Sequence, residues 1–366
     1  MRIVHTESSC GWGGQEIRIL TEAKGMIERG HEVTLLCPEE APIFTAAPRH
    51  GVPVQALPIA RKGWRGITAM RRWLQANPGV SLINTHSSTD SWLAALACTT
   101  LRHAPPIVRT RHVSSTVPDN RPTRWLYRKA ARHVVTTGEA LRQQLHRENG
   151  LPLTHLTSVP TGIDLARFAP GDKGAARTAL GLAPTGIYLG IVSTLRSWKG
   201  HSYLLEAMTH LSTVYCDLRL VIVGDGPQRQ NLEHKIAELG LAGKVMLAGQ
   251  RDDVPLWLNA LDLFTLPSYG EEGVPQAIMQ AMACGVPVVS TTVGAIGEAV
   301  VDGETGILVA PRDTDALSAA LARLIADPEM RKNMGEAGLA RARQRFGTAA
   351  MLDKMEAVFC QTVNRG

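Results

Sequence analysis

The sequence predicts an α/β protein made of two domains, each built on a parallel β-sheet. The chain has 366 residues, which is enough for two domains of ordinary size. Short runs rich in Val, Ile and Leu alternate with helical stretches along its whole length. Near-continuous apolar strands separated by helices are typical of parallel sheets that are covered on both faces.

Five strands are expected in the first half and six in the second. They are residues 2–5, 32–36, 82–85, 106–110 and 133–137, followed by residues 187–192, 218–223, 244–248, 261–266, 286–290 and 306–309. A first helix is expected over residues 15–29, with Ile17, Leu20, Lys24 and Ile27 on one side. Two such sheets predict two Rossmann-like domains that face each other across a cleft, with ligands bound beyond the carboxyl ends of the strands.

The domain boundaries follow from composition. Residues 1–165 are expected to form the N-terminal domain and residues 186–345 the C-terminal domain. Residues 166–185 between them are rich in Pro, Gly and Ala, which predicts a linker. Residues 346–366 are expected to form a helix that crosses back to the N-terminal domain.

Basic residues are concentrated in the first half. Residues 1–160 hold 20 Lys and Arg against 11 Asp and Glu, whereas the remaining residues hold 19 against 22. A positive face of this kind suits a phosphorylated or anionic partner, with a merely solvated surface as the alternative. No nucleic-acid motif accompanies the charge, so we expect no nucleic-acid partner.

Several other classes of protein are not expected. The N-terminus MRIVHTESS lacks an apolar stretch of signal-peptide length, and no run of about 18 apolar residues could span a membrane. The six cysteines are scattered, with no C-x-x-C pair. Asp313 and Asp315 form a D-x-D pattern, but they lie just before a helical stretch and are expected to cap it. The sequence therefore predicts a cytoplasmic protein without a metal site or cofactor.

Loops at strand ends in the first half carry candidate site residues. NTHSSTD follows a buried strand and places His86 where that strand ends. A lone His is often a satisfied polar residue, but the end of a parallel strand is where ligands bind. Arg109, Arg111 and His112 follow another strand end and could meet a phosphate on a substrate.

The second half has three further candidate loops. STLRSWKG ends a strand and presents Arg196 and Lys199, two cations that suit a diphosphate. VGDGP, with Gly224, is a common turn between strand and helix. GEEGVPQAIMQAMACGVPVVS places Glu271 and Glu272 before a Gly-Val-Pro break and a helix. At a helix start a carboxylate can interact with the helix dipole, and backbone N–H groups can bind an anion.

Together these motifs resemble the family-four retaining glycosyltransferases of the two-domain GT-B fold. The segment from residue 270 continues as TTVGAIGEAVVDGETGILVAPRDTDAL, which is similar to the family pattern E-G-F-G, a second Glu, A-M-A-C-G-P-V-V, G-G, E-V-V, D-G and T-G. VPTGIDLARFAP is similar to the family's P-N-G-V-D…F-x-P. The match covers almost the whole chain and is specific as a combination.

The resemblance implies roles for individual residues. Glu272 and His86 would position the donor sugar, while Arg196 and Lys199 would neutralise the departing diphosphate; these four are the expected catalytic residues, and Glu271 is a solvated neighbour. The expected donor-binding residues are Gly13, Gly14, Gly224, Gly273, Val274, Pro275, Gln276 and Gln280. The expected acceptor-binding residues are Arg109, Arg111 and His112.

Two positions depart from the family pattern. Thr194 stands where the family usually has Arg, and Gln280 stands where its second Glu holds the ribose hydroxyls. An amide accepts with one atom and donates with the other, whereas a carboxylate accepts from both hydroxyls. The exchange of a charge-assisted bond for a neutral one should weaken donor binding by roughly 1 kcal/mol.

The resemblance implies a reaction. A sugar would move, with retention of configuration and without a metal, from a nucleoside-diphosphate sugar to a lipid-linked, lipopolysaccharide or polysaccharide acceptor. A UDP-sugar is the first expectation and GDP-mannose the second. The alternatives are a non-catalytic sugar-nucleotide-binding protein, which Gln280 and Thr194 would permit, and a sugar-nucleotide epimerase of the same fold.

The acceptor is expected on the basic first half. RKGWRGITAMRRWLQ, residues 61–75, combines five basic residues with Trp64 and Trp73. Basic residues beside interfacial tryptophans suit peripheral contact with an anionic inner-membrane surface, although an ordinary amphipathic helix is the alternative.

Overall fold

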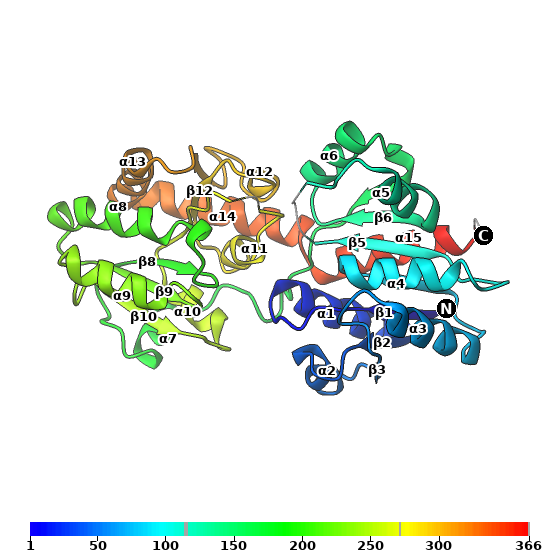
Figure 1. Ribbon diagram of the computed structural model, residues 1–366. Coiled ribbons are helices and arrows are strands. Elements are labelled where there is room, and N and C mark those ends of the chain that lie inside the picture. Colours follow the sequence, from blue (N-terminus) through cyan, green and yellow to red (C-terminus); the bar gives the residue numbers. More distant parts are fainter. Residues whose placement is uncertain (113–115, 271, 365–366) are drawn as a thin grey trace. The chain divides into compact units, whose positions relative to one another are not determined.

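The computed structural model describes residues 1–112, 116–270 and 272–364 (Figure 1). The chain forms two compact units. Unit 1 consists of Met1–Gly162 and Thr348–Gly366, and unit 2 consists of Ile163–Gly347. The C-terminal segment therefore returns to the unit in which the chain begins.

Unit 1 is built on a seven-stranded parallel sheet with the strand order β3-β2-β1-β4-β5-β6-β7. Its strands are β1 (Arg2–Thr6), β2 (Glu32–Cys37), β3 (Val54–Ala56), β4 (Leu82–Thr85), β5 (Ile107–Arg111), β6 (Ala131–Thr136) and β7 (Leu156–Ser158). Its α-helices are α1 (Gly14–Glu28), α2 (Pro42–Ala46), α3 (Trp64–Ala76), α4 (Ser88–Cys98), α5 (Arg121–Trp125), α6 (Glu139–Asn149) and α15 (Thr348–Asn364).

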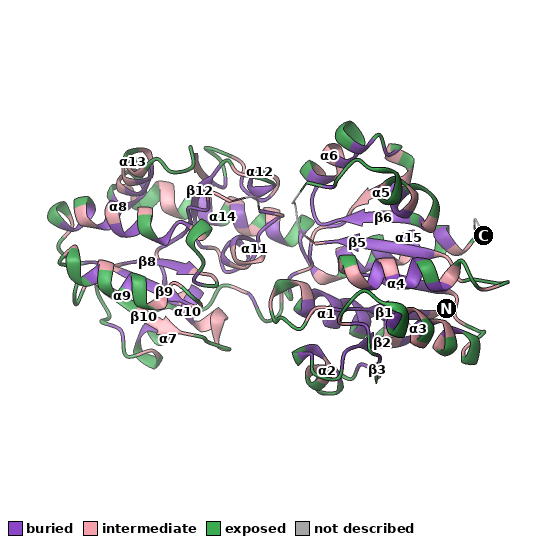
Figure 2. Cartoon of the chain, in the orientation of Figure 1, coloured by how far each residue is buried: buried purple, intermediate pink, exposed green. Residues whose placement is uncertain are grey.

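Both faces of this sheet are buried. Successive strand residues alternate between two apolar clusters: Leu82 packs with α1 and α15, whereas Ile83 packs with α3, α4 and α6. All five residues of β5 are buried, as the purple strand in Figure 2 shows. Because both faces are buried, the strands consist of nearly continuous runs of apolar residues.

Helix α15 is held to α1 by charge and by close packing. The Arg29 guanidinium donates to Asp353 and Glu356 at 2.6 and 2.7 Å. A Cβ on Gly25 would come within 2.3 Å of Leu352, so only glycine allows this approach. In Figure 1 the red α15 lies beside the blue α1.

Unit 2 is built on a six-stranded parallel sheet with the order β10-β9-β8-β11-β12-β13. Its strands are β8 (Ile187–Val192), β9 (Leu218–Val223), β10 (Val245–Gly249), β11 (Leu263–Leu266), β12 (Val288–Thr291) and β13 (Gly306–Val309). Its α-helices are α7 (Lys173–Ala179), α8 (His201–Val214), α9 (Arg229–Glu238), α10 (Val254–Ala260), α11 (Gln276–Ala283), α12 (Ile296–Ala299), α13 (Thr314–Ala326) and α14 (Pro328–Arg345).

The predicted fold class is confirmed, and all eleven expected strands are present within a few residues of their expected bounds. Strands β3 and β7 were not expected; both are three residues long and lie at the edges of their sheet. Residues 166–185 lie in unit 2, where they include α7 and a buried Arg177 that pairs with Asp262 at 2.6 Å. Of the residues expected on one side of α1, Leu20 is buried but Ile17 is 43% exposed.

Within the part of the chain that the structure describes, no helix combines the length and the apolar character needed to cross a membrane.

Candidate functional site

Each sheet has one point at which its strand order reverses. In unit 1 this point lies between β1 and β4, and in unit 2 it lies between β8 and β11. Ligands of open parallel sheets bind beyond the carboxyl ends of the strands at such a point. His86 directly follows β4, Lys199 lies in the loop after β8, and Glu272 lies in the loop after β11. The predicted catalytic residues therefore lie where each topology favours a ligand.

In unit 2, Glu272 and Lys199 form one contact. The Lys199 Nζ donates to Glu272 Oε1 at 2.6 Å, and the Ser268 hydroxyl donates to the same oxygen at 2.7 Å. Glu272 is 9% exposed. Among the described residues its second oxygen, Oε2, accepts no hydrogen bond, so that oxygen is available to a hydroxyl of a ligand.

Two glycines allow the loops of this site to approach each other closely. At Gly200, φ is +79° and a Cβ would lie 1.9 Å from the carbonyl oxygen of Pro267. At Gly294, φ is +55° and a Cβ would lie 2.1 Å from the carbonyl oxygen of Glu272, which accepts from the Ala295 N–H at 2.9 Å. Only glycine permits such close approaches with positive φ, so these residues fix the backbone that carries Lys199 and Glu272.

The other predicted cation, Arg196, is exposed and stacks over Trp198 at 5.4 Å from the ring centroid. The Arg196 N–H donates to the carbonyl oxygen of Thr194, so the two residues share one tight turn. The loop of Trp198 is joined to the loop of Glu272 by the Tyr269 N–H, which donates to the Trp198 carbonyl at 2.8 Å. Arg196 thus lies in the same pair of loops as Glu272.

The remaining predicted donor residues divide between the units. Gly273, Val274 and Pro275 lead into α11, with Pro275 as its N-cap; Gln276 opens that helix, and Gln280 lies half-buried on it. At Gly224 a Cβ would lie 2.0 Å from the Ser193 carbonyl oxygen, so packing alone requires glycine there. Gly13 caps α1 in unit 1 with an extended backbone, and Gly14 is the first residue of that helix. Glu271 lies outside the described residues.

In unit 1, three histidines form a hydrogen-bonded chain. His5 Nδ1 lies 2.9 Å from His86 Nε2, and His86 Nδ1 lies 2.9 Å from His112 Nε2. Burial lowers the pKa of His5 to about 3 and holds the pKa values of His86 and His112 well below their usual range, so all three rings are neutral at pH 7. Each link needs one N–H and one bare nitrogen, which couples the tautomers of the three rings.

Two buried carboxyl groups lie beside this chain. Glu7 Oε1 and Asp90 Oδ1 lie 2.9 and 2.8 Å from the Ser87 hydroxyl, which bridges them. Asp90 also accepts from the His86 N–H and the Thr6 hydroxyl. Burial, reinforced by the nearby Asp90, raises the pKa of Glu7 to about 8. Glu7 is therefore protonated at neutral pH while Asp90 completes the cap of α4.

A cavity of about 480 Å³ in unit 1 is walled by the predicted acceptor residues. Its lining residues are Ser9, Gln15, Lys62, His86, Ser87, Ser88, Trp92, Arg109, Arg111, His112, Thr116, Val117, Pro118, Thr123, Leu126 and Tyr127. The structure thus brings His86 together with Arg109, Arg111 and His112. Three permanent cations line this space, and none of its described lining residues is acidic.

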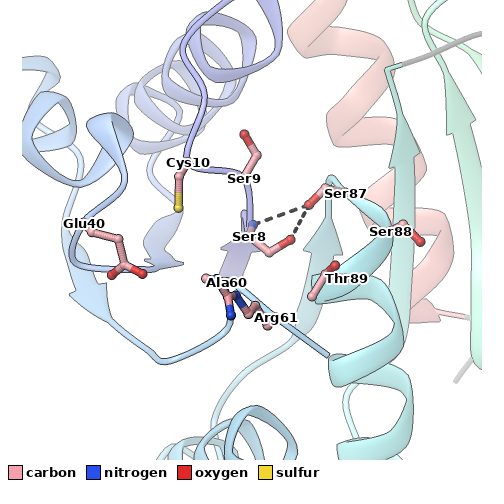
Figure 3. A pocket seen from close by; sticks show the side chains of 9 residues that line it. All are labelled: Ser8, Ser9, Cys10, Glu40, Ala60, Arg61, Ser87, Ser88 and Thr89. Atoms are coloured by element: carbon pink, nitrogen blue, oxygen red, sulfur yellow. Dashed lines mark hydrogen bonds between the residues drawn. The ribbon is translucent and has the colours of Figure 1, made fainter. Parts of the chain in front are cut away.

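A second hollow of about 460 Å³ adjoins this cavity through Ser9, Ser87 and Ser88, which line both. Figure 3 shows its side chains, with Ser8 and Ser87 joined by hydrogen bonds between the end of β1 and the start of α4. Its polar lining consists mainly of hydroxyl groups, together with Glu40 and Arg61. Unit 1 therefore offers a basic cavity next to a hydroxyl-rich one.

Comparisons with known proteins give the family of this chain. The family described as Glycosyltransferase Family 4 matches residues 12–167, and the family described as Glycosyl transferases group 1 matches residues 172–341. The D-inositol 3-phosphate glycosyltransferase 2 of Catenulispora acidiphila is 30% identical over 347 residues, which cover 87% of this chain and 79% of that protein. The chain belongs to glycosyltransferase family 4.

Two further likenesses support this assignment. The lipopolysaccharide core biosynthesis mannosyltransferase LpsB of Rhizobium meliloti is 34% identical over 211 residues, which cover 56% of this chain and 60% of that protein. The HepE protein of Anabaena, solved in complex with UDP-glucose, has a TM-score of 0.86 at 23% identity over 99% of this chain and all of that one. This glycosyltransferase therefore has the GT-B fold.

Some features of this glycosyltransferase were not expected from its sequence. His5 and Glu7 were not predicted as site residues, although both lie at the end of β1, which neighbours β4 in the sheet. Asp313 does cap α13 as predicted, accepting from the Ala316 N–H at 2.8 Å. No group of three or more His, Cys, Asp or Glu side chains that could hold a metal ion occurs in residues 1–112, 116–270 and 272–364.

The two tryptophans expected at a membrane surface differ in their surroundings. Trp64, at the start of α3, is 81% exposed. Trp73 packs against the core, and its indole N–H donates to Gln55. Only Trp64 is thus exposed in the manner of an interfacial anchor.

Proposed function

We propose that this glycosyltransferase moves a sugar, with retention of configuration and without a metal ion, from a UDP-sugar to a lipid-linked, lipopolysaccharide or polysaccharide acceptor. The observation that carries the donor half of the proposal is the Lys199–Glu272 contact at the switch point of unit 2. A buried carboxylate with one open oxygen can accept from a sugar hydroxyl, and the adjacent ammonium can meet a phosphate.

The proposed reaction breaks the bond between the anomeric carbon and the diphosphate oxygen and forms one to the acceptor oxygen. The acceptor proton passes to the departing phosphate on the same face of the sugar. Lys199, Arg196 and the N-terminus of α11 would stabilise the charge that develops on the diphosphate, so we expect no need for a cation. We assign donor recognition to unit 2 and acceptor recognition to the cavity of unit 1, with His86 as a sugar-contacting residue.

Two comparisons bear on the nucleotide base of the donor, and they favour different donors. HepE was solved with UDP-glucose, whereas LpsB is named as a mannosyltransferase. The test is a thermal-shift panel of UDP, GDP, ADP and CMP with and without magnesium, followed by donor turnover with and without a glycan acceptor. A ligand present at 100 times its Kd adds about 2.7 kcal/mol of stability. We expect a selective rise with UDP that magnesium does not change.

Each other outcome has a defined meaning. A selective rise with GDP would replace the donor by GDP-mannose. No rise with any nucleotide would sink the proposal in favour of a protein that has lost its donor site. Donor interconversion without an acceptor would indicate an epimerase.

The membrane part of the proposal rests on the exposed Trp64 together with Arg61, Lys62 and Arg65 around the start of α3. Basic residues and a tryptophan at one helix end suit peripheral binding to anionic lipid. We expect the protein to sediment with anionic vesicles at low salt and Trp64→Ser to reduce that binding several-fold. Equal sedimentation of the two proteins, or none of the wild type, would refute this part.

A further inference from the structure

Among the residues that the structure describes, Arg109 in unit 1 is a buried cation without a carboxylate partner. It is 5% exposed, and its Nε and Nη1 have no hydrogen-bond partner among the described residues. Its guanidinium stacks over Tyr127, 4.6 Å from the ring centroid. Burial of a charge is costly unless the charge is paired or hydrogen-bonded, and an aromatic face offsets only part of that cost. The position therefore calls for an anion that the chain itself does not supply.

The nearby carboxylate of Asp90 is already engaged. Burial raises the pKa of Asp90, and Arg109 offsets only part of that rise; no hydrogen bond joins the two side chains in the described part of the chain. Both oxygens of Asp90 accept from the cap of α4 and from Thr6. Asp90 thus serves the fold and leaves the guanidinium of Arg109 to face the cavity.

The walls of that cavity add to the positive potential. Arg109, Arg111 and Lys62 line it, and its described lining residues include no Asp or Glu. Arg111 donates to the hydroxyl of Tyr127 at 3.1 Å, so the tyrosine holds both guanidinium groups. A concave, basic space concentrates the field and favours an anionic guest.

The other walls suit a sugar. Trp92 lies under Lys62 Nζ at 5.7 Å and stacks on Trp125, so it presents a rigid aromatic wall. Hydroxyl groups of Ser88 and Thr123 supply donors and acceptors around it. About 480 Å³ is within the ordinary range of small-molecule sites and leaves room for a sugar ring with a substituent.

We propose that the acceptor is an anionic carbohydrate, a sugar bearing a phosphate or carboxylate group that binds against Arg109 while its ring lies along Trp92. This inference rests on the proposed function and names the class of its acceptor. Arg109 acts as a specificity-determining residue: it selects acceptors by charge and leaves the choice of donor to unit 2.

The test separates the anion site from the donor site. With UDP held at saturation to fill the donor site, inorganic phosphate is titrated against chloride at equal ionic strength, and the protein's melting temperature is recorded. We expect phosphate to stabilise the wild type and Arg109→Gln to weaken that binding at least about tenfold, because a charge-assisted bond is lost. Arg102→Gln, which removes an exposed arginine of the same unit outside the cavity, is the matched control and should behave like the wild type.

Acceptor pairs then distinguish the source of the anion. Glucose, glucose 6-phosphate and glucuronate are compared as soluble acceptors, and a phosphorylated glycolipid in phosphatidylcholine vesicles is compared with its unphosphorylated form. The wild type should favour the anionic member of at least one pair, and Arg109→Gln should reduce that preference about 10- to 100-fold. The pair that responds identifies a phosphate or a carboxylate, and a free or a lipid-borne one.

Two results would overturn the inference: no phosphate response in the wild type with UDP bound, or equal losses for anionic and neutral acceptors in Arg109→Gln. Failure of UDP itself to bind would instead count against the proposed function. If Arg109→Gln is too unstable to assay, Arg109→Lys keeps the charge but loses the planar fork. That variant should still reduce the preference for the anionic acceptor, and an unchanged preference would contradict the role of Arg109.

Discussion

The candidate site of unit 2 is built from the loops after β8, β11 and β12, whereas the cavity of unit 1 is assembled around the ends of β1, β4 and β5. Around Glu272, the partners Ser268, Lys199 and Gly294 lie in loops whose backbones press on each other. Around the cavity, His5, His86 and His112 come from β1 and from the ends of β4 and β5. Both sites join residues far apart along the chain, but Lys199, Glu272 and His86 each stand in a recognisable loop motif, whereas His5 does not.

The two sites also differ in whether their charged groups are paired. In unit 2 a carboxylate and an ammonium compensate each other within 2.6 Å. In unit 1 the histidines are neutral and Glu7 keeps its proton up to about pH 8, while Arg109 stays charged without a paired carboxylate. We expect the compensated pair to rearrange around the diphosphate sugar of the proposed donor. An uncompensated cation in a cavity without acidic walls is a place for an anion.

The largest effect is expected when the Lys199–Glu272 pair is broken. Glu272→Gln keeps the shape of the side chain but removes the charge-assisted bond to Lys199 and the one we propose to a sugar hydroxyl. Loss of two such bonds should lower kcat/KM by about 10²-fold or more while the fold is retained. Steady-state kinetics with the donor identified in the nucleotide panel measure this change.

Glu304→Gln is the matched control, because it removes an exposed carboxylate from the same unit. The control should keep wild-type kinetics. Near-wild-type turnover of Glu272→Gln would show that the carboxylate only holds Lys199 in place, and the comparison between the two sites would lose its functional meaning.

A second prediction concerns the protonated carboxyl of unit 1. The pKa of Glu7 is raised from 4.5 to about 8 in the folded protein, so between these values the unfolded chain has lost a proton that the folded chain keeps. Stability should therefore fall as pH rises across this window, by at most about 1.4 kcal/mol per pH unit from this one group. Glu7→Gln removes that contribution.

The measurement compares the melting temperatures of wild type and Glu7→Gln between pH 5 and pH 8. The wild type should lose stability relative to the variant as pH rises. Glu39→Gln, an exposed carboxyl in the same unit, should track the wild type at every pH. A pH-independent difference between wild type and Glu7→Gln would mean that Glu7 is already ionised in the folded protein.

The sequence was sufficient for the fold class and for the strands that are buried on both faces. It did not predict β3 and β7, because three-residue edge strands carry too few apolar residues to stand out. It grouped Ile17 with Leu20 on one side of α1, although Leu20 is buried and Ile17 is 43% exposed, because apolar spacing alone left the orientation of that helix open.

The candidate sites show the same limit. Lys199 and Glu272 were proposed from local motifs, and the structure adds their contact at 2.6 Å. His5 and Glu7 sit in an unremarkable first strand, and only the parallel pairing of β1 with β4 places them beside His86. When sheet topology brings two residues together, the spacing of residues along the chain does not reveal their contact.

The smallest effect is expected from a substitution at Gln280 in the candidate donor site. Gln280 lies half-buried on α11, at the position where the family pattern has a carboxylate. Gln280→Glu would restore a group that accepts from both ribose hydroxyls, and should tighten UDP binding by up to about tenfold. Calorimetric titration of UDP measures the change, with Gln230→Glu on α9 as a control for added negative charge. The gain should vanish for the 2′-deoxy form of UDP, because only one ribose hydroxyl then remains. An equal gain for both nucleotides would place Gln280 away from the ribose, and its departure from the family pattern would then have no bearing on the donor.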